Sequence, residues 1–439
     1  MLGYERRVVI TGLGLVTPLG DRPDVVWTSL MEGRGAVHRL EAFQVAGLPN
    51  DVAAEVRDFD LKKYALPHCA KELRKMRKYM ARDIQLAVAA AQIAVADAGL
   101  ATGGVDPTRF GIDLGAGLIS SELDELAPAI AKAYESGDEF DFQAWGRESI
   151  GMMEPIWLLK YLPNMLACHI SILIDCQGPS NTITEADASA NLAVAEATRI
   201  IARGRADVMI AGGADSKIHP LSLIRMGLLE NMSRWKGEPA GACRPFDADR
   251  SGWVPGEGAG IVVLEEREHA LKRGARIYGE ILGGGSGCDA KPGGGLDPEG
   301  VGTEVALTAA LADAGIEPSA IGHVNLHGSA TRVSDLAEAR ALHRVFGARA
   351  VPVTALKGYL GNLVSGCGSV EMIASLLAIR HGAIPPILNC DRPDHEIDAD
   401  LVVGSPRPLD NPLFLTTNLT PLGQAAALVV RGEGPSSGA

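Results

Sequence analysis

The sequence predicts an α/β protein built from two similar halves, and three observations support this. Short apolar, β-branched runs alternate with helical periods, which is typical of a sheet covered by helices. A helix expected to end in Ala96–Leu100 has a counterpart ending in Ala312–Ile316, and a turn and a strand-like run follow each. The third observation is composition, because 46% hydrophobic residues and 52 glycines in 439 residues supply a large interior and many tight turns. A chance likeness between two Ala-rich helices is the alternative to duplication.

The first half is expected to alternate strands and helices from its beginning. We expect strands at residues 6–12, 109–117 and 206–214, and helices at 83–99 and 188–204. This rhythm favours a parallel or mixed sheet, since parallel strands need long crossover connections. A second internal repeat relates the expected helix and strand within residues 197–213 to residues 373–389, which extends the duplication into the second half.

The expected boundary between the halves gives units of 1–255 and 256–439. The first unit contains an insertion at about 118–166, which has amphipathic character and the aromatic side chains of Trp145, Trp157 and Tyr161. A segment of this length either contacts a partner or covers a site. A helical cap over the core is the alternative.

Composition and charge exclude several classes of protein. A formal net charge of −13, from 41 basic and 54 acidic residues, repels a nucleic-acid backbone, so no nucleic-acid partner is expected. No run reaches the roughly 18 apolar residues of a membrane span, and the first residues lack a secretion signal, so a cytoplasmic location is expected. Seven cysteines without a C-x-x-C pair predict reduced thiols and no metal site. The turn at 12–14 lacks the third glycine of a dinucleotide fingerprint, and no cofactor is expected.

A basic segment occurs in this acidic chain at residues 71–82. It places five cations largely along one side of an expected helix, namely Lys71, Arg74, Lys75, Lys78 and Arg82. Such a face is suited to docking an acidic carrier protein. A solvated helix face without a partner is the alternative.

The most informative segment is a strand-to-helix turn in the first half. A β-type run at 181–184 ends at Glu185 and a helix is expected to begin at about Ala188, so Asp187 occupies the turn. A side chain there faces free backbone N–H groups and the positive end of the helix dipole, where enzymes place nucleophiles or oxyanions. The alternative is a structural N-cap, which stabilises a helix by about 1 kcal/mol and implies no chemistry.

At this turn the chain resembles the β-ketoacyl-acyl-carrier-protein synthases, the decarboxylating condensing enzymes of the thiolase superfamily. The matching segments occur in family order and include VVITGLGLVTPLG, ADVMIAGGAD, CRPFDADRSGWVPGEGAGIVVLEE, HVNLHGSAT and ALKGYLGN. The resemblance implies a thiolase-like fold of five layers, α-β-α-β-α, made of two duplicated halves. It also implies a dimer, and an acyl carrier protein that presents phosphopantetheine-linked acyl groups.

The resemblance assigns catalytic roles to residues of this chain, with departures at the chemistry. The family's nucleophilic cysteine falls on Asp187. Its first catalytic histidine matches His327, and its second falls on Asn362. The supporting charged pair matches Lys357 and Glu338.

Further positions match the part of the family that holds substrate. Ser329 and Thr331 match the hydroxyls that hold the pantetheine arm. Leu422 and Gly423 belong to the segment that occupies the position of the family's glycine-rich gate. Residues 291–295 occupy the position of a family loop that bears a threonine.

These substitutions predict that ordinary condensation is absent. A carboxylate cannot hold an acyl group as a thioester, and an ionised one opposes the oxyanion that must develop beside it. Asn362 keeps an amide donor but cannot exchange a proton near neutral pH. Pairing of His327 with Asp187 would favour the imidazolium form. A relic histidine held by inherited packing is the alternative.

The leading hypothesis is a non-condensing subunit that pairs with an active ketosynthase in fatty-acid or polyketide biosynthesis, as chain-length factors do. The dimer is then this heterodimer or a homodimer. One alternative is an acyl-thioester enzyme of altered chemistry, a hydrolase, acyltransferase or malonyl decarboxylase, that uses Asp187 and His327. The other is a non-enzymatic scaffold that binds a carrier protein or a lipid through residues 71–82.

Overall fold

The computed structural model describes residues 6–44, 51–100, 104–229 and 231–434. Within them, eleven strands form one sheet whose two halves meet where β1 (Val8–Val16) pairs with β8 (Gly279–Cys288) over three residues. From β1 the first half continues through β7 (Glu257–Glu266), β6 (Val208–Ser216), β4 (Phe110–Ala116) and β5 (Ser180–Ile183). From β8 the second half continues through β15 (Gln424–Gly432), β14 (Leu413–Leu419), β9 (His323–Asn325), β10 (Pro352–Thr354) and β12 (Asp400–Leu401).

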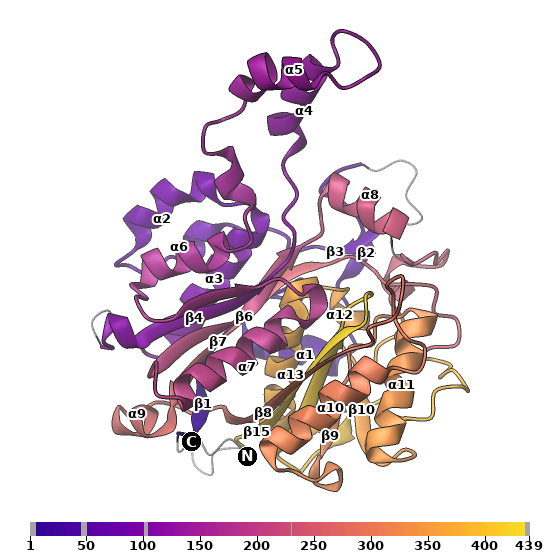
Figure 1. Cartoon of the computed structure of the whole chain (residues 1–439). Coiled ribbons are helices and arrows are strands. Elements are labelled where there is room, and N and C mark those ends of the chain that lie inside the picture. Colours follow the sequence, from indigo (N-terminus) through magenta and orange to yellow (C-terminus); the bar gives the residue numbers. More distant parts are fainter. Residues whose placement is uncertain (1–5, 45–50, 101–103, 230, 435–439) are drawn as a thin grey trace.

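Helices cover both halves of the sheet and stack the molecule into five layers (Figure 1). α3 (Arg82–Asp97) packs on the outer face of the first half. α7 (Ser189–Ala202) and α13 (Cys367–His381) lie between the halves and contact both. α10 (Val301–Ala314) packs on the outer face of the second half, with α11 (Arg332–Phe346) against it. The predicted α-β-α-β-α arrangement of two halves is confirmed.

The remaining helices and two small strand pairs surround this stack. The helices are α1 (Pro23–Met31), α2 (Ala70–Met76), α4 (Leu123–Ala133), α5 (Phe142–Ala144), α6 (Met165–Ile174), α8 (Pro220–Leu229), α9 (Arg267–Lys272) and α12 (Lys357–Leu360). The strand pairs are β2 (Val37–Arg39) with β3 (Val52–Ala54), and β11 (Ala383–Ile384) with β13 (Arg407–Pro408).

Small residues let α3 approach the sheet closely. The helix buries an alanine-rich face, and the facing strand β1 contributes Gly12 and Gly14. A Cβ atom on Gly14 would lie 2.0 Å from the carbonyl oxygen of Ala90, so a side chain cannot be accommodated at this position.

The first internal repeat is confirmed. α3 and α10 are each followed by a glycine in the left-handed conformation, Gly99 with φ 63° and Gly315 with φ 64°. Each then leads through a 3-10 turn into a strand of the large sheet, β4 in the first half and β9 in the second.

Two other expectations about the duplication need correction. β7 pairs antiparallel with β1 and β6, so this strand belongs to the first half although it follows the expected boundary at 255 and 256. The second internal repeat at 373–389 holds for the helix and not for the strand, since β11 spans two residues and pairs with β13 outside the large sheet. Pro385 and Pro386 follow β11, and proline has no N–H for a strand ladder.

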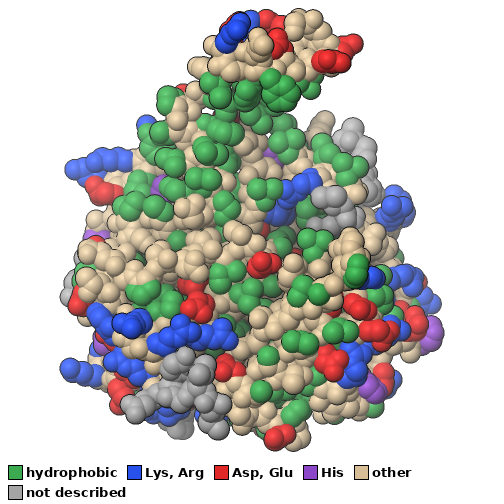
Figure 2. All heavy atoms as spheres, viewed as in Figure 1, with side chains coloured by type: hydrophobic (Ala, Val, Ile, Leu, Met, Phe, Trp, Pro, Cys, Tyr) green, Lys and Arg blue, Asp and Glu red, His purple; other side chains and the backbone are tan. Residues whose placement is uncertain are grey.

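The expected insertion at 118–166 leaves the body of the protein. Its helices α4 and α5 form a protrusion that stands clear of the sheet (Figure 1). Five of its large apolar side chains are more than half exposed, namely Leu118, Phe142, Ile150, Met152 and Leu158. Figure 2 shows apolar side chains gathered at the base of the protrusion. The outer part of the insertion is therefore not a cap over the core.

Candidate functional site

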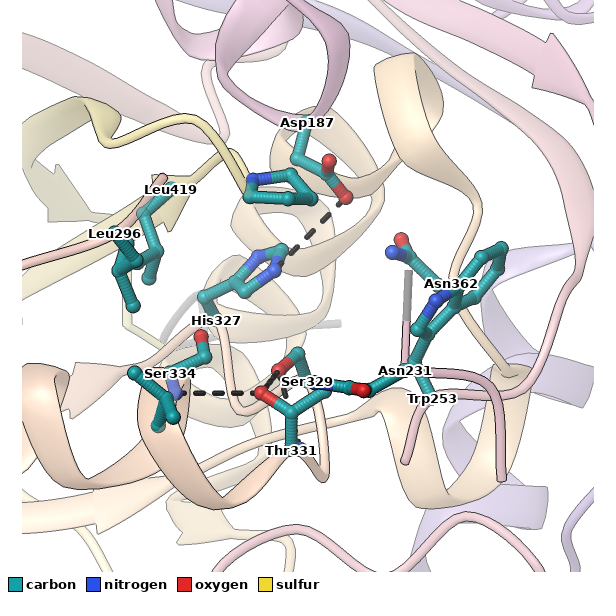
Figure 3. A pocket seen from close by; sticks show the side chains of 12 residues that line it. Asp187, Asn231, Trp253, Leu296, His327, Ser329, Thr331, Ser334, Asn362 and Leu419 are labelled. Atoms are coloured by element: carbon teal, nitrogen blue, oxygen red, sulfur yellow. Dashed lines mark hydrogen bonds and ion pairs between the residues drawn. The ribbon is translucent and has the colours of Figure 1, made fainter. Parts of the chain in front are cut away.

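A pocket of about 230 Å³ opens where three strands of the sheet end. β5 leads to Asp187, β9 leads to His327 and Ser329, and β14 ends at Leu419. β9 and β14 are parallel neighbours, so the loops after them emerge at the same edge. The structure thus brings five of the predicted site residues into one pocket (Figure 3), namely Asp187, His327, Asn362, Ser329 and Thr331.

Asp187 lies in a strained turn between β5 and α7. The turn is a short 3-10 helix (Ala186–Ala188), and α7 begins at Ser189, one residue after the expected start. Ala186 has a φ of 42°, which is unfavourable for a residue with a Cβ atom, and the N–H of Glu185 donates to Ser189 Oγ at 2.8 Å across the turn. No side-chain hydrogen bond caps this end of α7. The N-cap interpretation of Asp187 is therefore wrong.

The carboxyl group of Asp187 has an altered acidity. The residue is 3% exposed, and its Oδ1 has no hydrogen-bond partner among the described residues. Burial raises the pKa of Asp187 to about 6, although the Lys357 charge and a hydrogen bond from Asn362 oppose the rise. Near pH 6 this group can take up or release a proton, which an ordinary aspartate does about two pH units lower.

The ring of His327 is oriented by an amide network. Asn418 Nδ2 donates to Glu371 Oε2 at 2.7 Å and lies 3.2 Å from His327 Nδ1. The other end of the Asn418 amide, Oδ1, accepts a hydrogen bond from Asn191 at 2.8 Å. An amide nitrogen can only donate, so Nδ1 of His327 must accept. The proton therefore sits on Nε2, which lies 3.9 Å from Asp187 Oδ1.

His327 is a neutral imidazole. Burial, together with the nearby Lys357 charge, lowers the pKa of His327 well below its ordinary value. The expected pairing with Asp187 exists as proximity (Figure 3), yet the imidazolium form is not favoured. That expectation is corrected because the loss of hydration and a buried cation outweigh one carboxylate.

The supporting charged pair differs from the prediction. Lys357 Nζ donates to Glu371 Oε1 at 2.7 Å and to the backbone oxygen of His327 at 2.8 Å. Glu338 instead accepts the backbone N–H groups of His327 and Gly328 at 2.7 and 2.9 Å. The partner of Lys357 is therefore Glu371, and Glu338 fixes the loop that carries His327. Glu371 could have been found as the one acidic residue within the apolar run of α13.

Asn362 presents its amide N–H groups toward the pocket. Its Oδ1 accepts from the Val364 N–H at 3.0 Å and from the Cys367 thiol at 3.1 Å, so Nδ2 is the end that donates to the Asp187 carboxyl. Burial raises the pKa of Cys367 well above its ordinary value. The residue is absent from the pocket lining, so this thiol is not placed to act as a nucleophile.

Ser329 and Thr331 form a hydroxyl pair at one wall of the pocket. Their side-chain oxygens lie 3.1 Å apart, and Thr331 Oγ1 also accepts the Ser334 N–H as the N-cap of α11. Between them Ala330 adopts a φ of 64°, and its N–H donates to Asp335 Oδ1 at 3.1 Å. Both hydroxyls are thus held in place before any ligand binds.

The predicted gate residues lie outside the described pocket lining. Leu422 is 63% exposed, and Gly423 turns the chain with a φ of 90°. Leu419 and Pro421 line the pocket in their place, together with Leu296, which follows the 291–295 loop.

The basic face predicted at residues 71–82 is not a single helix. α2 ends at Met76, a 3-10 turn follows at Arg77–Tyr79, and α3 begins at Arg82. Arg82 donates to both carboxylate oxygens of Glu257, at 2.8 and 3.0 Å. Arg82 is thus held by a structural ion pair, while its side chain is 35% exposed and lines the same cavity as Arg74 and Lys78, and its docking role stays a prediction.

The other predicted cations remain available to solvent. Lys71, Arg74, Lys75 and Lys78 are exposed. Arg74 and Lys78, together with the unpredicted Arg77, line a separate cavity of about 670 Å³.

Sequence reasoning missed part of the pocket wall. Asn231, Trp253 and Val333 also line it, and they come from segments that are far apart in the chain. Nothing in their local sequence marks them as pocket residues.

Comparison with known proteins identifies the family. Residues 5–270 match the family described as beta-ketoacyl synthase, N-terminal domain, and residues 278–391 match the beta-ketoacyl synthase, C-terminal domain. The chain belongs to the beta-ketoacyl synthase family. Synthases of this family act in fatty-acid and polyketide biosynthesis, as the resemblance implied.

Individual members of the synthase family match over nearly the whole chain. The 3-oxoacyl-(acyl-carrier-protein) synthase 2 of Coxiella burnetii is 36% identical over 405 residues, which cover 92% of this chain and 93% of that protein. The solved ishigamide ketosynthase/chain length factor has a TM-score of 0.84 at 29% identity and covers 98% of this chain and 100% of its own. A type II polyketide acyl-carrier protein in complex with its ketosynthase gives 0.83 at 26% identity, covering 98% and 99%.

The described residues of this synthase-family chain hold neither a candidate metal site nor a candidate membrane span. No group of three or more His, Cys, Asp or Glu side chains among them is placed to hold a metal ion. Across the same ranges, none of the helices combines the length and apolar character that a bilayer crossing requires.

Proposed function

We propose that this protein is a non-condensing member of the synthase family that pairs with an active ketosynthase, as a chain-length factor does. The observation that carries the proposal is a carboxyl group at the turn before α7, in a pocket that keeps both hydroxyls expected to hold a pantetheine arm. Asp187 stands where the resemblance places the nucleophilic cysteine, while the Ser329 and Thr331 hydroxyls remain in position to hold a pantetheine arm.

The chemistry of Asp187 supports the absence of condensation. The reaction needs a thiolate that accepts the acyl group, and among the described residues no cysteine lines the pocket. An acyl group on a carboxylate would be a mixed anhydride, which water hydrolyses readily. A lost oxyanion donor alone costs about 3–4 kcal/mol of transition-state stabilisation, before the missing nucleophile is counted.

Two surfaces support a dimer. β5 lies at the end of the sheet order and pairs with β4 alone, with Ser180 and Asn181 exposed, and an edge strand of this kind can pair with a second chain. The exposed apolar side chains of the insertion form the kind of surface that contacts a partner. The solved ketosynthase/chain length factor supports an active ketosynthase as that partner.

An acyl carrier protein is the second proposed partner. The solved complex of a type II polyketide acyl-carrier protein with its ketosynthase supports this assignment. The exposed cations of α2 and the following turn offer an acidic partner a complementary surface. The cytoplasmic location expected from the sequence stays a prediction.

Coexpression with active ketosynthases tests the pairing. Native mass spectrometry is expected to detect a mixed dimer, and Leu158→Asp in the insertion should weaken it, because a charge would be buried at the contact. Val305→Asp on α10 is the matched control, since Val305 is 48% exposed and Leu158 is 53% exposed. Persistent absence of a mixed dimer with every ketosynthase tested contradicts the proposal.

A second candidate function is favoured by the acidity of Asp187. A carboxyl with a pKa of about 6 beside a neutral imidazole can act as an acid or base on a bound acyl thioester. Incubation with acyl- and malonyl-loaded carrier protein would then release free acid or carbon dioxide, and Asp187→Ala would abolish the release. No turnover by the wild-type chain removes this candidate.

A further inference from the structure

We infer that Trp253 is a ligand-binding residue whose indole N–H donates to the carbonyl oxygen of an acyl thioester held in the pocket. The ligand is the pantetheine-linked acyl group of the proposed function, on which this inference rests. Trp253 is thereby assigned as a positioning and specificity-determining residue of the site.

Trp253 brings an unpaired donor to the pocket. The residue lines the cavity, is 2% exposed, and its Nε1 has no hydrogen-bond acceptor among the described residues. Figure 3 places its ring on the same side of the pocket as the Asn362 amide. A buried indole N–H normally has a partner, so an unpaired one at a cavity wall points to a ligand acceptor.

The surroundings of the ring give no structural reason for an indole. Trp253 packs in an apolar cluster with Leu223, Met226 and Met232. A buried donor without an acceptor costs about 1–3 kcal/mol of folding free energy, whereas phenylalanine would fill apolar surroundings without that loss.

The main chain at Trp253 is anchored on both sides, and the apolar cluster packs against the ring itself. The N–H of Trp253 donates to the Asn231 carbonyl oxygen at 3.0 Å, and the Trp253 carbonyl accepts the Ser233 N–H at 2.8 Å. The donor is therefore positioned before a ligand enters, which reduces the entropy lost on binding.

The neighbouring groups define which acceptor fits. Asn362 Oδ1 is occupied by Val364 and Cys367, so its amide contributes N–H donors, and His327 carries its proton on Nε2. One Asn362 N–H is engaged by Asp187, so the remaining Asn362 N–H, the His327 Nε2–H and the Trp253 indole N–H are the donors beside the Asp187 carboxyl. A second carboxylate would be repelled by ionised Asp187, so a neutral carbonyl oxygen is the matching group.

Two small probes test this assignment directly. Acetyl-pantetheine carries the thioester carbonyl, and S-ethyl-pantetheine has a methylene in its place. By calorimetric titration, Trp253→Phe is expected to weaken acetyl-pantetheine binding about tenfold and to leave S-ethyl-pantetheine within about twofold, because only the carbonyl loses a hydrogen bond. Trp157→Phe is the matched control, since Trp157 Nε1 is also buried without a partner but does not line the pocket.

A spectroscopic readout separates binding from folding. The indole N–H resonance that disappears in Trp253→Phe should shift in the wild-type protein when acetyl-pantetheine is added, and should not shift with S-ethyl-pantetheine. Equal weakening of both probes, or of neither, overturns the assignment of Trp253 and leaves the proposed function standing. A wild-type protein that binds neither probe overturns the assignment of Trp253 as well, whereas the proposed pairing is decided separately by the mixed dimer.

Discussion

His327 Nε2 lies 3.9 Å from Asp187 Oδ1, and both side chains are at most 4% exposed. Asn418 fixes the imidazole proton on Nε2, so an N–H group faces the carboxyl across the pocket. Burial suppresses the charged form of each partner, which raises the pKa of Asp187 to about 6 and lowers that of His327. The pocket therefore holds a carboxyl beside a neutral imidazole instead of a thiolate beside an imidazole, which is the physical basis of the proposed loss of condensation.

Asp187→Asn is expected to stabilise the protein at pH 8 and to change little near pH 4. The pKa of this carboxyl rises from 3.8 to about 6 on folding, so the folded state binds the proton more tightly and stability falls as pH rises between these values. Above pH 6 the folded wild-type protein holds a buried carboxylate, which costs on the order of 3 kcal/mol of stability. The uncharged asparagine side chain avoids this cost. Urea unfolding at about pH 4, 6 and 8 measures the free energy of unfolding.

Asp207→Asn provides a control of opposite sign. Hydrogen bonding to Arg109 lowers the pKa of Asp207 to about 2, so its charged form stabilises the folded state above its ordinary pKa, and that stability is lost as pH falls toward 2. This variant should lose stability at neutral pH. A loss of stability at pH 8 in both variants would show that Asp187 is not held in an unfavourable charged state.

Asp187→Cys is expected to introduce a thiol that becomes acylated. Placed at the strained turn before α7, a cysteine faces the positive end of a helix, which favours its thiolate. Intact-mass measurement after incubation with acyl-loaded carrier protein should show one acyl adduct, whereas the wild-type chain should show none. Condensation should stay low, because Asn362 does not replace a second histidine. An adduct on the wild-type chain would contradict the assignment of Asp187.

Glu371→Ala is expected to destabilise the protein by about 3–5 kcal/mol, because it leaves Lys357 buried without its carboxylate. Chemical unfolding measures the loss. Asp24→Ala is the control, since the Asp24–Arg22 pair is 69% and 65% exposed and solvent screens its attraction, so its removal should leave stability almost unchanged. Similar losses in the two variants would mean that another group, such as Glu338, compensates Lys357.

Lys71→Glu with Lys75→Glu is expected to weaken carrier-protein binding about tenfold at low salt, because both exposed cations lie on α2. Titration at two salt concentrations checks the electrostatic origin. The pair Lys272→Glu and Arg276→Glu makes the same charge change elsewhere on the surface and should have no effect. Arg82 is left unchanged, since its ion pair with Glu257 is structural. Unaltered binding in the α2 variant removes the docking face and the scaffold hypothesis with it.

Local sequence signals determined the layers, the first repeat and the turn at Asp187. Helical and strand periods depend on neighbouring residues, so α3, α7 and α10 were predictable from the chain alone. The ordered family segments also gave most of the pocket, since each loop follows a recognisable strand.

Only the tertiary structure decided which buried groups meet. Lys357 pairs with Glu371 and not with Glu338, and Asn418 selects the tautomer of His327. The unpaired indole of Trp253 in the pocket wall was equally invisible in the sequence. These arrangements depend on how separate elements pack, because the direction of a side chain within a packed interior depends on all the elements around it.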